Sequence, residues 1–303
     1  MCGSYWSITI HTGGCGCRGD RHIMKRRENK KPLNSSNNNI SLTPVRPTAS
    51  SSEFESWSGQ GLYPADDSRV ILERETEEES DFINASYISG YAPGSPKFIA
   101  SQGPTAATID DFWLMIWQQK TSSVVMVTNV VEERKHKCDQ YWPDDTSTEL
   151  RYGDITVSMV SADEWADYMV RMLKVEKDGE VRTVKQYHYT SWPDHGVPDS
   201  MSPFIFFYKR VKIETAKTTT PIVVHCSAGV GRTGTFIAMN NLLEQAKVEE
   251  RVNFHQCVKK MRTCRPSMVQ TEDQYVFLHQ VVSEYLITKE FFCSPSAFAQ
   301  QTG

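Results

Sequence analysis

The residues best suited to do chemistry lie together in the nine-residue stretch 225–233, His-Cys-Ser-Ala-Gly-Val-Gly-Arg-Thr. A short apolar, β-branched run at 221–224 precedes it and predicts a buried strand, and residues 233–247 have the pattern of a helix. The stretch is therefore a strand-to-helix turn, whose two glycines permit unusual backbone dihedrals. In such a turn the backbone N–H groups of residues 227–232 can surround one oxyanion in front of a helix N-terminus. The sequence predicts a phosphate-sized binding site here.

Cys226 and Arg232 suit this oxyanion site to nucleophilic chemistry on phosphate. Amide dipoles and a nearby cation favour a thiolate over a thiol, so Cys226 is predicted to be a nucleophile. Arg232 carries a planar guanidinium that can bind two phosphoryl oxygens at once. A buried structural cysteine, or an anion-binding turn without chemistry, would explain either residue alone. Their joint occurrence between a strand and a helix favours catalysis, and a stabilised thiolate predicts reversible inactivation by oxidation.

The sequence HCSAGVGRTGT at 225–235 resembles the signature loop of the tyrosine-specific protein phosphatases, which use a cysteinyl-phosphate intermediate. Six further stretches resemble landmarks of this family in the same order: DFINASYI (81–88), FIASQGP (98–104), DFW (111–113), KCDQYWP (137–143), WPDHGVP (192–198) and QTEDQY (270–275). Together the landmarks span residues 64–286, and the stretches at 90–104 and 138–143 are most like receptor-type catalytic domains. The resemblance implies an α/β fold, a single phosphatase domain whose highly twisted mixed central sheet is flanked by helices on both faces. We call residues 225–233 the signature loop and residues 192–198 the acid loop.

The resemblance assigns two chemical steps to residues of this chain. Cys226 attacks phosphorus while the signature loop holds the phosphoryl oxygens; the substrate-binding residues are Ser227, Ala228, Gly229, Val230, Gly231, Arg232 and Gln274. Asp194, in a loop punctuated by glycine and prolines, protonates the departing phenolate as a general acid. Asp194 then acts as a base on a water that Gln270 positions, and the Thr233 hydroxyl helps the thiolate to leave.

Four supporting residues complete the predicted site, namely His225, Glu132, Trp192 and Lys137. His225 is expected to hold the signature loop as a structural donor rather than as a base. Glu132 stands at the spacing where the family has a carboxylate that orients the signature arginine. Without the resemblance, Glu132 would be interpreted as a surface residue of a charged stretch. The expected chemistry needs no metal and no other cofactor.

Alternating strands and helices are predicted to position these residues. Strands are expected at 123–128, 155–160, 168–175, 184–190 and 221–224, and helices at 108–119, 204–214, 233–247, 254–262 and 271–286. The hydroxyl of Thr271 can cap the last of these helices. The signature loop is thereby expected at the end of a central strand, with the acid loop following the strand at 184–190.

The 303 residues are expected to form one phosphatase domain at 61–289 with two tails, and 39% hydrophobic residues suit one sizeable domain. Residues 1–60 are predicted to be a disordered basic tail unrelated to the family, and 290–303 an irregular tail. Residues 1–52 carry eight Lys and Arg against two Asp and Glu, so the remaining body is acidic, which argues against nucleic acid binding.

The cysteines and the hydropathy pattern bear on the compartment. The spacing of the eight cysteines does not indicate a framework of disulfides. The sequence also has no run of about 18 apolar residues, the length needed to span a membrane. We therefore expect a cytoplasmic protein, or the cytoplasmic portion of a receptor-type membrane protein. The expected partners are phosphotyrosine-containing proteins.

One landmark is missing at the start of the predicted domain. Where the family has a Lys-Asn-Arg-Tyr motif, this chain has Ser-Trp-Ser-Gly at 56–59, so the tyrosine that stacks on the substrate is absent. Either a different N-terminus has replaced that part of the domain, which we favour, or Trp57 or Tyr63 forms the aromatic wall. Two alternatives follow: a phosphotyrosine-binding pseudophosphatase, which the intact catalytic residues oppose, and a dual-specificity or lipid phosphatase with a shallower site.

Overall fold

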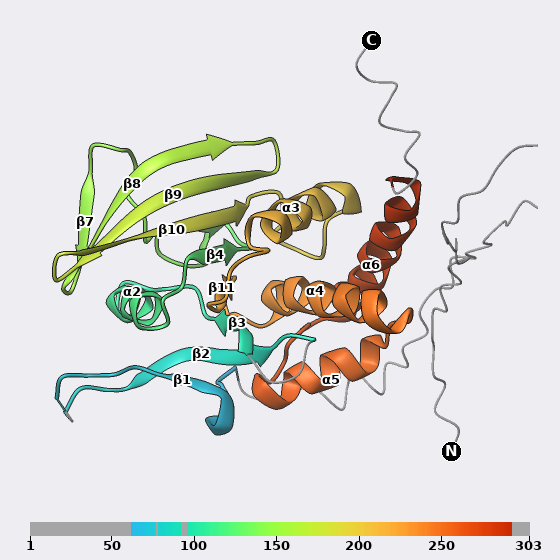
Figure 1. The fold of residues 1–303 in the computed structure, drawn as a ribbon, viewed down its shortest axis with the longest axis horizontal. Helices are drawn as coiled ribbons and strands as arrows, with labels where there is room; N and C mark the ends of the chain where they lie inside the picture. Colours follow the sequence, from blue (N-terminus) through green and yellow to red (C-terminus); the bar gives the residue numbers. More distant parts are fainter. Residues whose placement is uncertain (1–61, 77, 92–95, 293–303) are drawn as a thin grey trace, which may run out of the picture.

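The computed structural model describes residues 62–76, 78–91 and 96–292 (Figure 1). The elements in chain order are η1 (Asp66–Ser68), β1 (Arg69–Ile71), β2 (Phe82–Ser89), β3 (Pro96–Ser101), α2 (Ile109–Gln118), β4 (Ser123–Met126), β5 (Val131–Glu132), β6 (Lys135–His136), β7 (Glu149–Tyr152), β8 (Ile155–Glu164), β9 (Tyr168–Lys177), β10 (Glu180–Tyr189), α3 (Met201–Glu214), β11 (Ile222–His225), α4 (Gly231–Glu249), α5 (Phe254–Cys264) and α6 (Glu272–Phe292). The predicted tail at 1–60, which includes Trp57 and the position of the missing tyrosine, lies outside the described residues.

Nine strands form one mixed sheet in the order β1-β2-β3-β11-β4-β10-β9-β8-β7, and β5 and β6 form a separate hairpin. The four strands β3, β11, β4 and β10 run parallel, whereas the strands on either side of them pair antiparallel. Carboxyl ends of neighbouring parallel strands meet at one edge of a sheet. The segments that follow these four strands, which include the signature loop and the acid loop, are therefore brought to the same edge.

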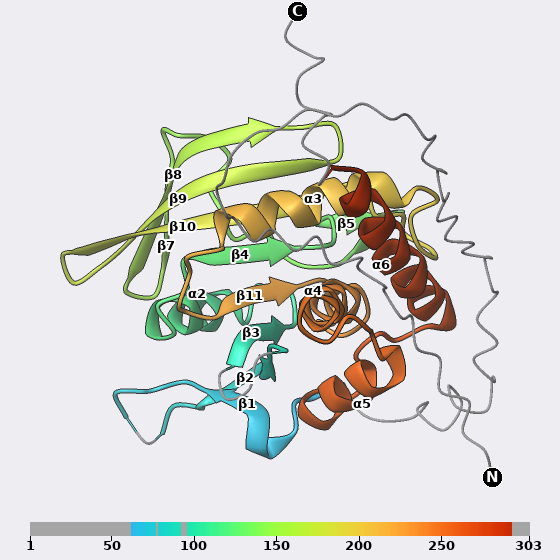
Figure 2. The same cartoon turned by 45° about the vertical axis from the view of Figure 1, so that its right-hand side comes forward.

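Alternation along the central strands sends side chains to two separate cores. In β11, Ile222 and Val224 pack with α3, α4 and α6, whereas Val223 packs on the opposite face with α2 (Figure 2). All four residues of β11 are buried, as expected for a central parallel strand covered on both faces. The predicted fold class, a mixed sheet with helices on both faces, is confirmed.

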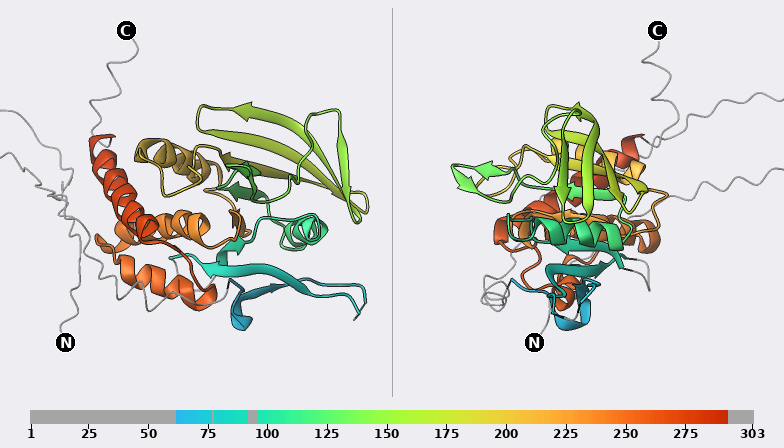
Figure 3. Two further views of the ribbon diagram at one scale, coloured as in Figure 1. Left: turned by 180° about the vertical axis from the view of Figure 1, so that it is seen from behind. Right: turned by 90° about the vertical axis from the view of Figure 1, so that its left-hand side faces the viewer.

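The long strands β8, β9 and β10 extend away from the helices α5 and α6 (Figure 3). The sequence predicts that β8 ends at 160, but the strand continues to Glu164. Its register shifts between Met159 and Ser161, and Val160 is exposed, as in a β-bulge. The bulge interrupts the alternation of apolar and polar residues, which is why the pattern predicted too short a strand.

Two helix boundaries also differ from the prediction. The helix α4 begins at Gly231 rather than at 233, so the end of the signature loop is already helical. The helix α6 continues to Phe292, past the predicted helix end at 286, because neither glycine nor proline interrupts it. The predicted cap is present, since the Thr271 hydroxyl accepts from the Gln274 N–H at 3.2 Å. None of the helices in the described ranges is long and apolar enough to cross a membrane.

Candidate active site

The signature loop starts at the carboxyl end of β11 and runs directly into the N-terminus of α4 (Figure 1). Gly229 has a φ of 72°, and a Cβ atom placed there would lie 2.2 Å from the carbonyl oxygen of Ser101. The left-handed backbone and the lack of space both require glycine at this position. A Cβ atom on Gly231 would lie 2.8 Å from Nε2 of Gln274. The loop is thus packed closely between the end of β3 and the first turn of α6.

Three consecutive carbonyl groups of the signature loop are bound on its outer side. The Ser227 carbonyl accepts from the Gly103 N–H at 2.9 Å, and buried Arg265 donates to the Ala228 and Gly229 carbonyls at 3.1 and 2.8 Å. In a trans peptide the N–H group points away from the carbonyl of the same unit. The amides that follow these three carbonyls therefore face the centre of the loop, where the N-terminus of α4 adds the positive end of its dipole. This backbone geometry suits an oxyanion of phosphate size.

Cys226 lies at the base of the signature loop and is buried. The fully buried ring of His225 donates from Nδ1 to the Cys226 carbonyl at 3.1 Å, which leaves Nε2 to accept from the Tyr141 hydroxyl at 2.8 Å. Burial lowers the pKa of His225 to about 4, so the ring is neutral at physiological pH. His225 therefore contacts the backbone of Cys226 as a neutral donor.

Arg232 and Glu132 form a bidentate ion pair, with Nη1–Oε1 and Nη2–Oε2 distances of 2.6 and 2.9 Å. They come from the first turn of α4 and from the β5–β6 hairpin. The buried Glu132 carboxylate also accepts from the Thr128 hydroxyl at 3.1 Å and from the Asn129 N–H at 3.0 Å. Because both of its oxygens are bound to the guanidinium, Glu132 fixes the plane of Arg232 beside the signature loop.

Asp194 lies on the acid loop, and only 5% of its side chain is exposed. The Lys137 ammonium lies 2.7 Å from Oδ1, and this contact lowers the pKa of Asp194 to about 2. The carboxyl group is therefore ionised at neutral pH in this arrangement. Arg232 donates from Nη2 to the Pro193 and Asp194 carbonyls at 3.1 and 3.4 Å. The acid loop thus lies against the same guanidinium that Glu132 orients.

Trp192 anchors the acid loop in the core. Its buried ring packs against Phe204 and Phe277, and Nε1 donates to the Gly196 carbonyl at 3.2 Å. Gly196 has a φ of 72° and no atom near its Cβ position, so glycine is favoured here by the left-handed backbone of the turn and not by a lack of space. The first residue of the loop is therefore fixed by packing, whereas its middle is held by polar contacts.

The tip of the acid loop faces the β5–β6 hairpin. His195, 74% exposed, has its Nε2 atom 3.1 Å from a Glu133 carboxylate oxygen. Glu133, Asp194 and His195 each offer one potential metal ligand, and the three atoms lie within 4.8 Å of one another. Each of these side chains is already paired with a protein group, because Asp194 also binds Lys137. The contacts tie the acid loop to the hairpin.

The remaining predicted residues lie around the start of α6 and of α4. The Gln274 side chain accepts from the Gln270 N–H at 2.8 Å and lies against Gly231, whereas Gln270 is exposed. Thr233 is fully buried, and its hydroxyl has no hydrogen-bond partner among the described residues. Gln274 therefore contacts the signature loop directly, and Gln270 is held beside it by its backbone.

Sequence reasoning did not single out two residues that contact the loop. Gly103 donates to the Ser227 carbonyl, and a Cβ atom on it would lie 2.5 Å from the Cys226 carbonyl. Tyr141 supports His225, as described above. Both fall within quoted landmarks, so their positions were marked although their roles were not. Tyr63, one candidate for an aromatic wall, is 66% exposed and contacts the Phe82 ring at 6.3 Å between centroids.

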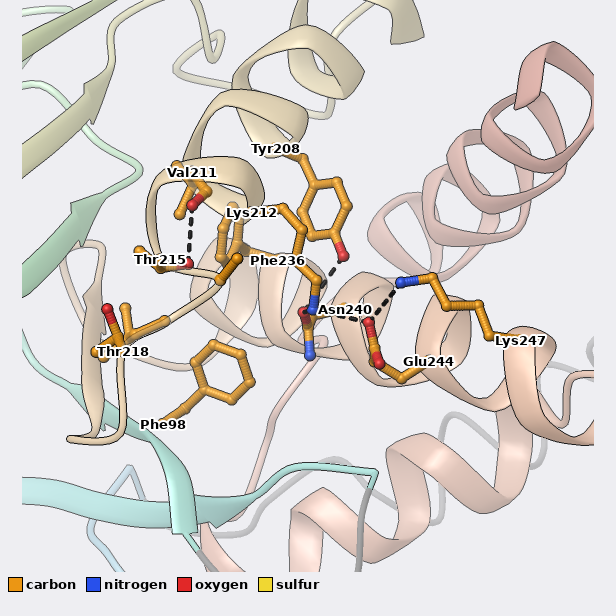
Figure 4. Close-up of a pocket in the computed structure, with 12 residues that line it drawn as sticks. Phe98, Tyr208, Val211, Lys212, Thr215, Thr218, Phe236, Asn240, Glu244 and Lys247 are labelled. Carbon is orange, nitrogen blue, oxygen red and sulfur yellow. Dashed lines mark hydrogen bonds and ion pairs between the residues drawn. The ribbon is translucent and has the colours of Figure 1, made fainter. Parts of the chain in front are cut away.

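A separate pocket of about 280 Å³ lies between α3 and α4, and none of the predicted site residues lines it (Figure 4). Its polar groups bind one another. Asn240 accepts from Tyr208 at 3.2 Å and from Lys212 at 3.1 Å, and Glu244 bridges Lys212 and Lys247 at 2.7 and 2.9 Å. The chemistry expected from the sequence is concentrated at the signature loop instead.

Comparison with known proteins agrees with this geometry. Residues 59–284 match the family model described as protein-tyrosine phosphatase. The chain is 44% identical over 210 residues to the rat protein named phosphatidylinositol phosphatase PTPRQ, covering 69% of this chain and 9% of that protein. It is 47% identical over 229 residues to chicken receptor-type tyrosine-protein phosphatase eta, covering 74% of this chain and 16% of that protein. A Caenorhabditis elegans relative, tyrosine-protein phosphatase Lar-like, is 45% identical over 222 residues, 72% of this chain and 10% of that protein. The chain thus matches only a small part of the length of these relatives.

Proposed function

Because this chain belongs to the protein-tyrosine phosphatase family, we propose that its domain hydrolyses phosphotyrosine in proteins through a cysteinyl-phosphate intermediate. The observation that carries the proposal is the signature loop, whose outer carbonyls are bound by Gly103 and Arg265 so that its amides face inward above Cys226. A preorganised ring of N–H donors stabilises the charge that develops on the equatorial oxygens in the transition state.

In the first step the Cys226 thiolate attacks phosphorus in line, forming the S–P bond while the bond from phosphorus to the phenolic oxygen breaks. Arg232, held flat by Glu132, binds two equatorial oxygens. Asp194 delivers a proton to the departing phenolate. The Lys137 contact keeps Asp194 ionised without substrate, so the negative charges of phosphate and thiolate must raise its pKa before it can act as an acid.

In the second step a water attacks the phosphorus of the cysteinyl-phosphate and the S–P bond breaks. Asp194, now ionised, takes the proton of that water, and the exposed Gln270 at the start of α6 positions it. The Thr233 hydroxyl, buried without a partner among the described residues, is free to donate to the departing thiolate. As proposed, the two steps need no metal.

A lipid phosphatase is the second candidate, because the rat and human relatives named phosphatidylinositol phosphatase PTPRQ are each 44% identical to this chain. The absent tyrosine at position 59 would also leave a shallower site. A pseudophosphatase is disfavoured, because the chain retains all of the predicted catalytic residues Cys226, Arg232, Asp194 and Gln270. We further propose that the domain acts on the cytoplasmic side of a receptor-type membrane protein.

The test is a comparison of three substrates: a phosphotyrosine peptide, its phosphoserine twin, and a phosphatidylinositol phosphate in mixed micelles, each with a Cys226→Ser control. We expect turnover of the phosphotyrosine peptide, abolished by the substitution. Faster turnover of the lipid would replace the proposal with the lipid phosphatase. Tight binding of the phosphotyrosine peptide without turnover of any substrate would leave a pseudophosphatase.

A further inference from the structure

A buried arginine lies behind the active site and belongs to none of the landmarks. Arg171 in β9 is only 9% exposed, and its guanidinium packs over the Trp142 ring at 4.5 Å from the centroid. It forms no ion pair with a carboxylate of the described residues. Burial lowers the pKa of its guanidinium. A buried cation without a counter-ion is costly unless its N–H groups are bound, so its hydrogen-bond partners carry unusual weight.

The first set of contacts leads from Arg171 to the nucleophile. Arg171 stands opposite Gln186 across the β9–β10 ladder and donates to its Oε1 at 2.8 Å. Gln186 Nε2 donates to the Tyr141 hydroxyl at 2.8 Å, and that hydroxyl donates to Nε2 of His225 at 2.8 Å. His225 then donates from Nδ1 to the Cys226 carbonyl at 3.1 Å.

All the protons in this chain of hydrogen bonds point in one direction. A guanidinium can only donate, so Arg171 must face the oxygen of Gln186, and the amide nitrogen must face Tyr141. Burial raises the pKa of the Tyr141 hydroxyl, which therefore keeps its proton and donates it to His225. A neutral ring that accepts at Nε2 carries its own proton on Nδ1. The cation thus favours the same His225 tautomer that the Cys226 carbonyl, which can only accept, requires.

A second set of contacts leads from the same nitrogen of Arg171 to the arginine of the signature loop. Arg171 Nη1 lies 3.3 Å from Nδ1 of His188, whose Nε2 donates to the Thr128 carbonyl at 2.8 Å. Burial and the charge of Arg171 lower the pKa of His188 to about 3, which keeps that ring neutral. The Thr128 hydroxyl donates to Glu132, which in turn holds Arg232.

We propose that Arg171 is a positioning residue that sets both the backbone of Cys226 and the Glu132–Arg232 pair. It touches no reacting atom and acts through Gln186 and His188. The inference rests on the proposed phosphatase activity, because its effect is on the geometry of that site.

The experiment compares Arg171→Met with Arg182→Met. Arg182 is the control, since it also stacks on a tryptophan, Trp117 at 3.7 Å, and binds a carbonyl, but is partly exposed, pairs with Glu180 and contacts no residue of the site. With p-nitrophenyl phosphate we expect Arg171→Met to lower kcat by about 10²-fold and to change KM by less than about threefold. Arg182→Met should leave kcat within about twofold of the wild-type value. Equal kcat values for the two folded variants would overturn the proposal.

A spectroscopic measurement separates positioning from general destabilisation. The ¹⁵N chemical shifts of the His225 ring report which nitrogen carries the proton. We expect the Nδ1–H tautomer in the wild type and in Arg182→Met, and a mixture of tautomers in Arg171→Met. An unchanged tautomer in Arg171→Met would contradict the proposed role.

Gln186→Met covers the case in which Arg171→Met does not fold, because it breaks the contacts that lead to Tyr141 and keeps the cation with its contact to His188. We expect a kcat loss of about tenfold, and no further loss when Tyr141→Phe is added, since the two residues share one path. Additive losses would refute that path.

If the wild type turned over no substrate, the proposed phosphatase activity would fail, but the affinity of the variants for tungstate would still test the positioning role of Arg171. We expect Arg171→Met to bind tungstate about tenfold more weakly than Arg182→Met. Equal affinities of the two variants would overturn the positioning role.

Discussion

The signature loop and the acid loop meet at Arg232, but they are held in different ways. The carbonyls of the signature loop bind buried donors, above all Arg265, and its glycine at 229 leaves no room for another side chain. The middle of the acid loop is held by the ammonium of Lys137 and, at the surface, by the pairing of His195 with Glu133.

This difference separates a fixed part of the site from an exchangeable one. Buried donors are costly to leave unpaired, so they favour a single geometry for Cys226 and the amides around it. The pair of His195 with Glu133 is exposed and contributes little net free energy, because water and salt replace it readily, whereas the pair of Lys137 with Asp194 is a single, largely buried ammonium contact. We therefore expect the acid loop to be the part that moves to admit substrate, with Trp192 as its fixed end. Four substitutions test this contrast.

The largest effect is expected from Gly229→Ala in the signature loop. The new Cβ would meet the Ser101 carbonyl at 2.2 Å, at a φ of 72°, so the loop must move. We expect kcat/KM for p-nitrophenyl phosphate to fall on the order of 10³-fold, because the amide donors are displaced. Gly153→Ala is the control, with a φ of 57° and no atom within 4 Å of its Cβ position. Similar activities of the two variants would show that the loop is not rigid.

Glu132→Gln tests the buried ion pair of the fixed part. Removing the carboxylate charge leaves Arg232, whose side chain is only 12% exposed, without its counter-ion, which costs about 3 kcal/mol of unfolding free energy. We also expect a fall in kcat/KM on the order of 10²-fold, since the guanidinium loses its orientation. Urea unfolding and steady-state kinetics measure the two effects. The neighbouring Glu133→Gln should change the unfolding free energy and kcat/KM by much smaller amounts. Equal changes in the two variants would mean that the burial of Glu132 does not distinguish it from Glu133.

Lys137→Met tests the exchangeable part through pH. Lys137 lowers the pKa of Asp194 to about 2, so its removal should return that pKa toward the ordinary range. The acid then keeps its proton to higher pH, and the alkaline limb of the kcat profile moves upward. The folded state of the wild type gains stability from ionised Asp194 above the unfolded pKa of about 3.9 and loses it as pH falls toward 2, a dependence that the variant should lack.

The kcat–pH profile and acid unfolding curves of Lys137→Met check both effects. Lys135→Met, on the exposed strand β6, is the control for the loss of one positive charge. Identical profiles for the two variants would mean that Lys137 does not set the pKa of Asp194.

The smallest effect is expected from His195→Ala. The contact with Glu133 is exposed, so its loss should change the unfolding free energy by less than about 1 kcal/mol and kcat by only a few-fold. His136→Ala, which breaks a similar exposed contact with Asp139 at 3.1 Å, serves as the comparison. A loss of kcat as large as that of Glu132→Gln would place the tip of the acid loop in the fixed part of the site.

The sequence predicted the elements whose signals are local. The apolar run at 221–224 predicted a buried strand, which the structure has at 222–225, and the Thr271 cap marked the start of α6. Predictions failed where a local signal was interrupted or spread out, as at the bulge near Val160 in β8 and at the continuation of α6 to Phe292. The resemblance to a family located Glu132, which its own neighbourhood would have placed at the surface.

The sequence by itself predicted Cys226 as the nucleophile and determined the glycines around it and the strand-loop-helix that carries them, because backbone sterics and side-chain periodicity act between near neighbours. Only the tertiary structure decided which distant groups meet, such as Glu132 with Arg232, Lys137 with Asp194 and Tyr141 with His225. Those meetings set the protonation states of the site, since a pKa depends on burial and on the nearest charges, and neither quantity follows from separation along the chain.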